Sequence, residues 1–247
     1  MSNFRIQAAC VTDTGLVRAS NQDSVFCDDK LGLFMVADGM GGHAGGETAS
    51  KLCIETVVSE IESSLSTSHL EELPKVLRSS FNTASEIIFD EASNNSSLKG
   101  MGTTATLAAI VSDRATIAHV GDSRCYLVRN GSIKQLTTDH SLVAEEVRQG
   151  RLTEKEAKNH KLKNVITRCI GIKPYEETDV IKLRVFANDA LVLCSDGLHA
   201  VVSDEDILSE VSSNGTLGAS SLKDLAIKHG GPDNVSVCVV SITEDTP

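Results

Sequence analysis

Residues 36–47, which read VADGMGGHAGGE, are the stretch around which the chain is organised. The apolar run at residues 33–37 predicts a buried strand that is too short for a helix. This strand is expected to stop at Asp38-Gly39, and the glycines that follow let the backbone turn tightly and approach a ligand closely. A carboxylate at a strand end beside bare backbone suits a hard divalent cation. On its own the stretch fits a surface loop with a turn aspartate better than a metal site, so its recurrence elsewhere decides between the two.

The composition indicates an acidic globular protein with an aliphatic core. The 247 residues are 40% apolar, include no tryptophan and carry a formal net charge of −11. This charge argues against nucleic acid or an anionic membrane as the main partner, because both are bound by basic patches. A phosphate site is still compatible with it, since bound metal ions reverse the local charge.

The seven cysteines and the N-terminus indicate the compartment. The cysteine count is odd, and no pair has the two-residue spacing of a zinc or redox motif. Most of the cysteines sit in apolar runs, where a reduced cysteine acts as a small hydrophobic residue. The N-terminus lacks the features of a signal peptide, and no apolar stretch approaches the roughly 20 residues that span a bilayer. A reduced, soluble, cytoplasmic and monomeric protein is expected.

Apolar periodicity predicts many short strands with paired helices between them. Antiparallel sheets covered by helices, an α+β fold, follow from this succession. No linker or repeat divides the chain, so one domain over residues 1–247 is expected. Strands are expected at residues 6–11, 24–27, 33–37, 103–111, 115–120, 125–128, 180–186, 191–194 and 235–242, and helices at residues 46–64, from Pro74, around Ile207 and at residues 219–228.

Residues 141–161 are highly charged and have only a weak helical period. They predict two short helices broken near Gly150. Because the segment has too little apolar content to form a domain, it is interpreted as an insertion or lid.

Four aspartates, Asp38, Asp122, Asp196 and Asp233, each stand where a strand meets a loop, beside glycine or proline. Acids placed at the ends of elements could converge at one edge of a sheet core. Oxygen ligands without a His or Cys pattern favour Mg²⁺ or Mn²⁺ over zinc. Two such ions about 4 Å apart could share a water, lower its pKa and clamp a phosphoryl group.

Arg18 is a candidate for holding a phosphate, because a guanidinium pairs with two phosphate oxygens at once. The alternative is a surface arginine that forms an ion pair with Asp23.

A series of short motifs runs in order over nearly the whole chain, and together they resemble one family. The motifs are RASNQD at 18–23, DGMGGH at 38–43, GTT at 102–104, GDSR at 121–124, DHS at 139–141, NVITR at 164–168 with Gly171, SDG at 195–197 and GPDN at 231–234. In this order they resemble the metal-dependent serine/threonine protein phosphatases of type 2C in their compact bacterial form. The resemblance implies a four-layer αββα sandwich of two antiparallel β-sheets flanked by helices, with a flap at about residues 141–171.

The resemblance also implies the site. Two Mn²⁺ or Mg²⁺ ions would be bridged by Asp38, with the Gly39 carbonyl on the second ion and Asp196 and Asp233 on the first. Asp122, together with Asp196, would hold the third, weaker ion of bacterial members. Asp23 would orient the metal-bound water, and Arg18 would bind the substrate phosphate.

The chain departs from the family pattern at the proton donor. Animal members have a histidine directly after Asp-Gly, where this chain has Met40. His43 is therefore the candidate donor; the alternative is that His43 is a loop histidine and metal-bound water supplies the proton. The remaining histidines are interpreted as structural or surface residues. Leu162 stands where the family has proline near Asn164, so the local shape of the flap is left open.

The implied activity is hydrolysis of phosphoserine and phosphothreonine on proteins, with targets of a serine/threonine kinase as partners. One alternative is an inactive pseudophosphatase that binds phosphoproteins, although such a protein would normally lack a metal ligand. Another is a phosphatase of small phosphoesters, which would use the same metals. A nucleotide-binding loop is not favoured, because the glycine-rich stretch lacks the lysine and Ser/Thr of a P-loop.

Overall fold

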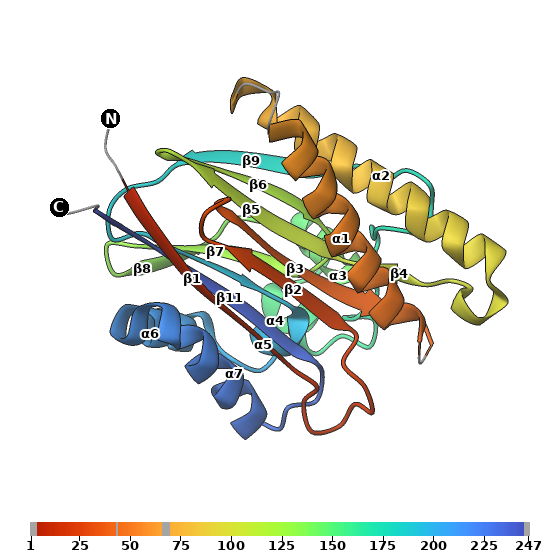
Figure 1. Cartoon of the computed structure of the whole chain (residues 1–247). Helices are drawn as coiled ribbons and strands as arrows, with labels where there is room; N and C mark the ends of the chain where they lie inside the picture. Colours follow the sequence, from red (N-terminus) through yellow and green to blue (C-terminus); the bar gives the residue numbers. More distant parts are fainter. Residues whose placement is uncertain (1–3, 43, 66–69, 245–247) are drawn as a thin grey trace.

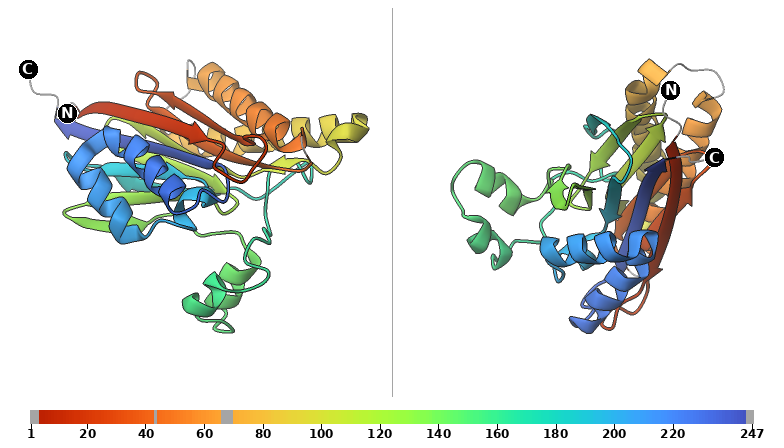
Figure 2. Two further views of the ribbon diagram at one scale, coloured as in Figure 1. Left: turned by 90° about the horizontal axis from the view of Figure 1, so that it is seen from below. Right: turned by 90° about the vertical axis from the view of Figure 1, so that its left-hand side faces the viewer.

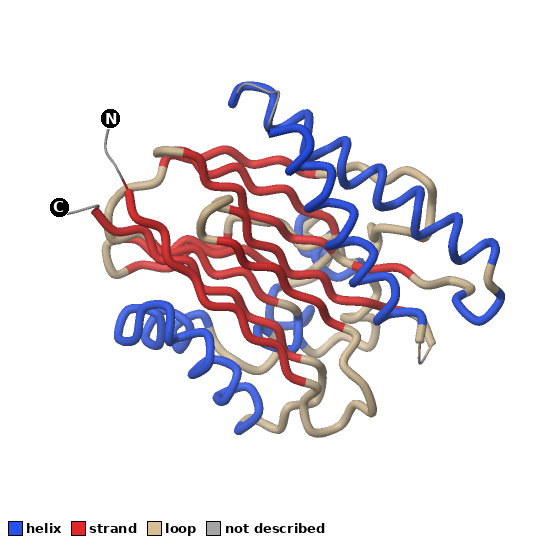
Figure 3. Tube along the Cα trace, in the orientation of Figure 1, coloured by secondary structure: helices blue, strands red, loops and turns tan. Residues whose placement is uncertain are grey.

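Two antiparallel β-sheets lie face to face, and helices cover the outer face of each sheet (Figures 1 and 3). The computed structural model describes residues 4–42, 44–65 and 70–244. The arrangement confirms the α+β, four-layer αββα sandwich expected from the sequence. None of the helices in these described ranges is long and apolar enough to cross a membrane.

The two sheets are built from strands that are distant in sequence, and every neighbouring pair is antiparallel. The first sheet has the order β1 (Phe4–Asp13), β11 (Val235–Glu244), β10 (Ala190–Cys194), β7 (Arg124–Arg129) and β8 (Ser132–Gln135). The second has the order β2 (Asp23–Asp28), β3 (Leu33–Met40), β5 (Ala105–Val111), β6 (Arg114–Val120) and β9 (Asp179–Arg184), and β4 (Gly102–Thr103) pairs with the end of β3. The first two strands of the chain, β1 and β2, are therefore edge strands of different sheets.

Each sheet carries its own set of covering helices (Figure 1). The second sheet is covered by α1 (Gly45–Leu65) and α2 (Leu73–Asn94), and the first by α5 (Asp196–His199), α6 (Asp204–Asn214) and α7 (Gly218–Lys228). The predicted apolar stripe of α2 is fully buried: Leu77, Phe81, Ala84 and Ile88. Such a stripe is what holds an amphipathic helix against a sheet.

Strand β3 shows why its apolar run is continuous. Leu33 and Met35 pack against the covering helices, whereas Phe34 and Val36 face the other sheet. Side chains alternate between the two faces of a strand. Because both faces of β3 are covered, polar alternation is absent, and each large side chain contributes roughly 1.5–3 kcal/mol by its burial.

The structure corrects where β3 ends. The strand was expected to stop at Asp38-Gly39, but it continues to Met40, because Gly39 and Met40 pair with Thr103 and Gly102 of β4. The predicted strand at residues 103–111 is correspondingly broken at Thr104. Asp38-Gly39 thus lies within a strand, while the similar Asp196-Gly197 begins helix α5.

The charged segment forms two short helices, α3 (Leu142–Arg148) and α4 (Glu154–Lys158), as predicted, with Gly150 between them at φ +70°. Both views in Figure 2 show these helices standing away from the sandwich. Ser141 caps α3, and Thr153 forms a capping box with Glu156 at the start of α4. Such caps satisfy free backbone N–H groups where little packing supports a helix.

Candidate active site

The four predicted aspartates line one pocket of about 410 Å³. Its walls come from the loop before β2, the end of β3, the turn after β6, the start of α5 and the loop before β11. Asn164 and Ile166, which follow the flap helices, also line it. The predicted convergence of these distant acids is therefore observed. The lining residues are Arg18, Ala19, Ser20, Gln22, Asp38, Gly39, Met40, Gly41, Gly42, Asp122, Asn164, Ile166, Asp196, Asp233 and Asn234.

Asp23 lies beside this pocket, directly across from Asp38 in the β2–β3 pair. The Ser195 hydroxyl donates to Asp23 Oδ2 at 2.8 Å, whereas Asp23 Oδ1 is buried without a hydrogen-bond partner. Burial raises the pKa of Asp23 to about 6, even though hydrogen bonds from Ser236 and Ser195 oppose the shift. A buried carboxylate oxygen without a partner is costly, so this atom is left to accept a hydrogen bond from a group that binds next to Asp23.

The pocket is strongly anionic. Burial, followed by the negative charge of Asp23 and Asp196, raises the pKa of Asp38 well above its ordinary value. Burial and the charge of Asp196 likewise raise the pKa of Asp122 to about 7. Among the described residues that line the pocket, Arg18 is the single basic side chain. One guanidinium cannot balance this cluster of carboxylates, so their mutual repulsion adds to the effect of burial on these pKa values.

Divalent cations fit this pocket on the chemistry of its donors. The four carboxylates and a backbone approach at Gly39 form an oxygen-only set, which hard ions such as Mg²⁺ or Mn²⁺ prefer, and the orphaned Asp23 Oδ1 lies beside this set. The carboxylates surround the pocket without forming a single-ion cage: within the described ranges, no three of their oxygens lie within 4.8 Å of one another.

Two adjacent threonines hold Asp38 in place. The Asp38 amide donates to Thr104 Oγ1 at 3.0 Å, and the Thr103 hydroxyl donates to the Asp38 carbonyl at 2.9 Å. Thr104 Oγ1 also lies 2.8 Å from the Ser123 hydroxyl, which connects Asp38 to the turn that carries Asp122. The GTT motif at residues 102–104 was quoted from the sequence without a role. The position of this motif between two apolar segments is the one sign of such a role in the sequence.

Asn234 is a second residue that was quoted in a motif, GPDN, without a role. Its Oδ1 accepts a hydrogen bond from the backbone N–H of Gln22 at 2.8 Å. Its Nδ2 donates to the backbone carbonyls of Thr14 and Ser20. Asn234 therefore holds the Arg18 loop against the segment that carries Asp233. The signal was its position directly after a candidate ligand.

Arg18 lies in the pocket wall, and its ion-pair partner differs from the alternative considered above. Its Nη2 donates to Asp233 Oδ2 at 2.7 Å, so the partner is Asp233 and not Asp23. The Arg18 side chain is 54% exposed. The guanidinium therefore lies between the carboxylates and solvent, where an incoming anion meets it.

Two of the remaining histidines, His119 and His199, have structural contacts. Burial lowers the pKa of both His119 and His199 to about 4, so both rings are neutral. His119 is hydrogen-bonded to the Thr106 hydroxyl and to the Thr138 backbone carbonyl. His199 Nε2 lies 3.0 Å from the Asp122 backbone carbonyl, and this hydrogen bond stabilises the turn that carries Asp122. His43, the candidate proton donor, lies outside the described residues.

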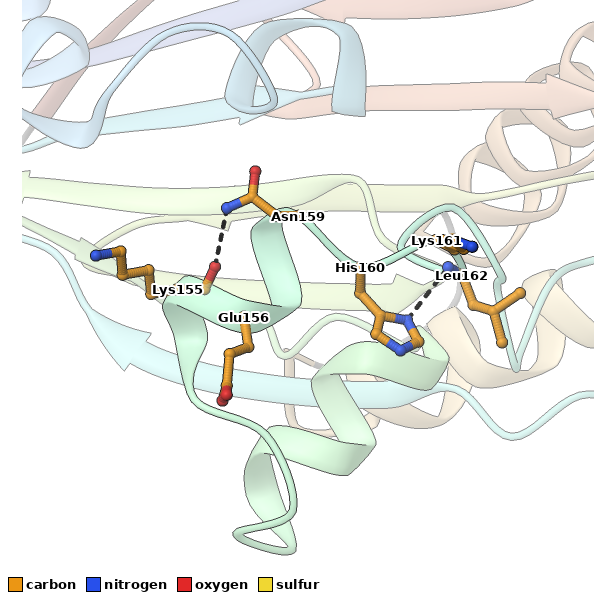
Figure 4. A pocket seen from close by; sticks show the side chains of 6 residues that line it. All are labelled: Lys155, Glu156, Asn159, His160, Lys161 and Leu162. Atoms are coloured by element: carbon orange, nitrogen blue, oxygen red, sulfur yellow. Dashed lines mark hydrogen bonds between the residues drawn. The ribbon is translucent and has the colours of Figure 1, made fainter.

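A larger hollow of about 810 Å³ lies on the flap (Figure 4). None of the four aspartates lines it. Its lining residues are Lys155, Glu156, Asn159, His160, Lys161 and Leu162. Asn159 Nδ2 donates to the Lys155 carbonyl at 3.2 Å, and the Leu162 amide donates to His160 Nδ1 at 3.2 Å. These two hydrogen bonds join side chains to the backbone of the same turn and connect no pair of acid, base or nucleophile side chains. The smaller pocket is therefore the candidate active site.

Comparison with known proteins agrees with this geometry. Residues 7–235 match the family model for protein phosphatase 2C. The chain is 36% identical over 234 residues to a serine/threonine phosphatase, stp, of Listeria innocua, with 93% of each chain covered. It is also 38% identical over 244 residues to the serine/threonine protein phosphatase PstP of Mycobacterium tuberculosis, where the match covers 97% of this chain and 45% of that protein.

Solved structures show the same similarity. The crystal structure of the M. tuberculosis phosphatase PstP superposes with a TM-score of 0.89 at 36% identity, covering 97% of this chain and 99% of that one. A structure of the PstP catalytic domain in complex with two manganese ions gives a TM-score of 0.88 at 35% identity, covering 98% and 100%. The fold, the order of the motifs and the acidic pocket therefore lead to one conclusion: the chain belongs to the protein phosphatase 2C family of metal-dependent serine/threonine phosphatases.

Proposed function

We propose that this chain hydrolyses phosphoserine and phosphothreonine monoesters on proteins, with two Mn²⁺ or Mg²⁺ ions in the aspartate pocket. The observation that carries the proposal is the convergence of Asp38, Asp122, Asp196 and Asp233 with Arg18 in one pocket. The manganese-bound PstP structure supports the choice of metal.

The family resemblance and the donors in the pocket together suggest the metal ligands. Asp38, the Gly39 carbonyl, Asp196 and Asp233 would hold the two ions. Asp122, with Asp196, would hold a third, weaker ion. When bound, such ions activate water as a nucleophile and neutralise the charge of the phosphoryl group.

The side chains around the metals bind and orient the reactants. Asp23 Oδ1 is buried and free to accept a hydrogen bond, so it is placed to orient the attacking water. Arg18 exchanges Asp233 for the substrate phosphate, because its exposed guanidinium can pair with two phosphate oxygens. His43 as proton donor stays a prediction, and an unchanged pH profile of turnover in His43→Ala would exclude it.

A substrate panel tests the activity. With Mn²⁺ present, we expect phosphoserine and phosphothreonine peptides to be hydrolysed faster than phosphotyrosine peptides or small metabolite phosphates. A chelator should lower the rate by at least about 10³-fold, because the lost ions supply several kcal/mol of transition-state stabilisation, and added Mn²⁺ should restore it. A metabolite preferred by about a hundredfold would instead favour a small-phosphoester phosphatase. Binding without any turnover would indicate a pseudophosphatase.

Replacing Arg18 tests the phosphate contact. Arg18→Ala should raise KM for a phosphopeptide and lower kcat/KM by about 10- to 100-fold, because a hydrogen bond to a charged group contributes roughly 1.5–3 kcal/mol. Arg18→Lys should recover only part of this loss, since lysine cannot pair with two oxygens. Steady-state kinetics with both variants would measure the effect, and an unchanged KM in Arg18→Ala would rule out the contact.

We also propose the partners and the domain organisation of the chain. Phosphorylated proteins are the substrates, and targets of a serine/threonine kinase are the natural class. Residues 1–247 form one catalytic domain, with the flap at about 141–171 beside the pocket. The cytoplasmic location and monomeric state expected from the sequence stay predictions.

A further inference from the structure

Three cysteines from distant parts of the chain meet at the edge of the sandwich. Cys10 lies on β1, Cys27 on β2 and Cys238 on β11. Their sulfur atoms all lie within 4.8 Å of one another. Among the described residues, no other trio of cysteine, histidine, aspartate or glutamate side chains is this compact. All three cysteines are free thiols, and none of them lines the aspartate pocket.

The cluster joins the two sheets. Cys10 and Cys238 are directly paired across β1 and β11 of the first sheet, whereas Cys27 comes from the edge strand of the second. The Cys10 thiol also reaches across to the Phe26 carbonyl of β2, at 3.7 Å. Cys238 is buried, Cys10 is half-buried and Cys27 is exposed. One side of the trio is therefore anchored in the core between the sheets, and the other side opens to solvent.

This arrangement suits a soft cation. A tetrahedral Zn²⁺ with sulfur ligands at about 2.3 Å places those sulfurs roughly 3.8 Å apart, which is within reach of small rotamer adjustments here. Three protein ligands leave the fourth position to water on the exposed side. Hydrogen bonding from Cys238 and Cys10 lowers the pKa of Cys27 to about 7, against the opposing charges of Asp29 and Asp28. Burial and the contacts with Cys10 and Cys27 raise the pKa of Cys238 well above its ordinary value, so its proton is released when a cation binds.

We propose that Cys10, Cys27 and Cys238 form a binding site for a thiophilic divalent cation of the Zn²⁺ class, separate from the aspartate pocket. On binding, the three thiols release three protons to solvent, and each sulfur donates a lone pair to the cation. No oxidation or reduction is involved. Because the ligands come from both sheets, the bound ion ties β2 to the β1–β11 pair and stabilises this edge of the sandwich.

Cobalt spectroscopy tests the site directly. The full chain is reduced with a phosphine, its aspartate pocket is saturated with Mn²⁺, and Co²⁺ is then titrated. Thiolate ligands produce intense sulfur-to-cobalt charge-transfer bands in the near ultraviolet, whereas the oxygen ligands of the aspartate pocket produce none. We expect these bands to saturate at one Co²⁺ per chain and to disappear when Zn²⁺ displaces it.

Two variants locate the signal. Cys27→Ser should abolish the bands, and it should fold because Cys27 is exposed. Cys169→Ser, which removes a thiol outside the trio, should keep the bands unchanged. Both variants should retain Mn²⁺-dependent phosphatase activity, which serves as the check on folding.

Thermal unfolding provides the second measurement. With the aspartate pocket held by Mn²⁺, Zn²⁺ at about 100 times its Kd should raise the Tm of the parent by roughly 5–10 °C, and Cys27→Ser should lose this shift. The proposal is overturned by the absence of charge-transfer bands, or by bands that persist in Cys27→Ser. A loss of two hydrogens by mass spectrometry under the same reducing conditions would also overturn it, since the trio would then be a disulfide pair.

Discussion

Asp38→Asn is expected to lower kcat/KM for a phosphopeptide by at least about 10³-fold. Asp38 is proposed to bridge two ions, and an amide cannot replace a carboxylate that both ions share. Metal ions supply several kcal/mol of transition-state stabilisation, and about 4 kcal/mol corresponds to a thousandfold change in rate. Steady-state kinetics at saturating Mn²⁺ and isothermal titration with Mn²⁺ would measure the lost turnover and the weakened metal binding.

The same substitution should leave the fold intact. Burial and, after it, the charges of neighbouring carboxylates raise the pKa of Asp38, so a neutral amide at this position avoids both costs in the metal-free protein. We therefore expect the denaturant concentration at which half of metal-free Asp38→Asn is unfolded to be at least as high as that of the metal-free parent. Asp90→Asn, an exposed acid on α2, is the matched control and should change neither property. Parent-like turnover in Asp38→Asn would show that the metal assignment is wrong.

Gly197→Ala is expected to lower both stability and activity. A Cβ at this position would meet the Asn234 carbonyl oxygen at 1.9 Å, because α5 approaches the segment before β11 that closely. One of these segments must move, and overpacking of this kind costs about 1–3 kcal/mol. The movement also separates Asp196 from Asp233, which are proposed to share an ion, so turnover should fall more steeply than stability.

Thermal unfolding and kinetics at varied Mn²⁺ separate these two effects. We expect Tm to fall by roughly 3–10 °C for a chain of this length, and the Mn²⁺ concentration needed for half-maximal activity to rise. Ser209→Ala, at an exposed position of α6, controls for the insertion of alanine into a neighbouring helix. Alanine is a better helix former than glycine by about 1 kcal/mol, so a Gly197→Ala protein that is fully active and more stable than the parent by about this amount would mean that the close approach has no consequence.

The candidate metal ligands could be read from the sequence to a large extent. Asp38, Asp122, Asp196 and Asp233 were all identified, since each lies where an apolar run meets glycine or proline, and all line the pocket. The residues that hold them were missed. Thr104 and Asn234 make their bonds to chain segments 66 and 212 residues away, which no local pattern indicates.

The sequence by itself determined the succession of strands and helices and the class of ligand: its apolar periods predict buried strands and covering helices, and its acids predict oxygen ligands. The four-layer order was implied by the family resemblance. Only the tertiary structure decided that Arg18 pairs with Asp233, that β3 continues through Asp38, and that Cys10, Cys27 and Cys238 meet. The physical reason is that periodicity reports which face of one element is buried. Contacts between residues more than 200 positions apart depend instead on how the edge strands and loops of two separate sheets are placed against each other.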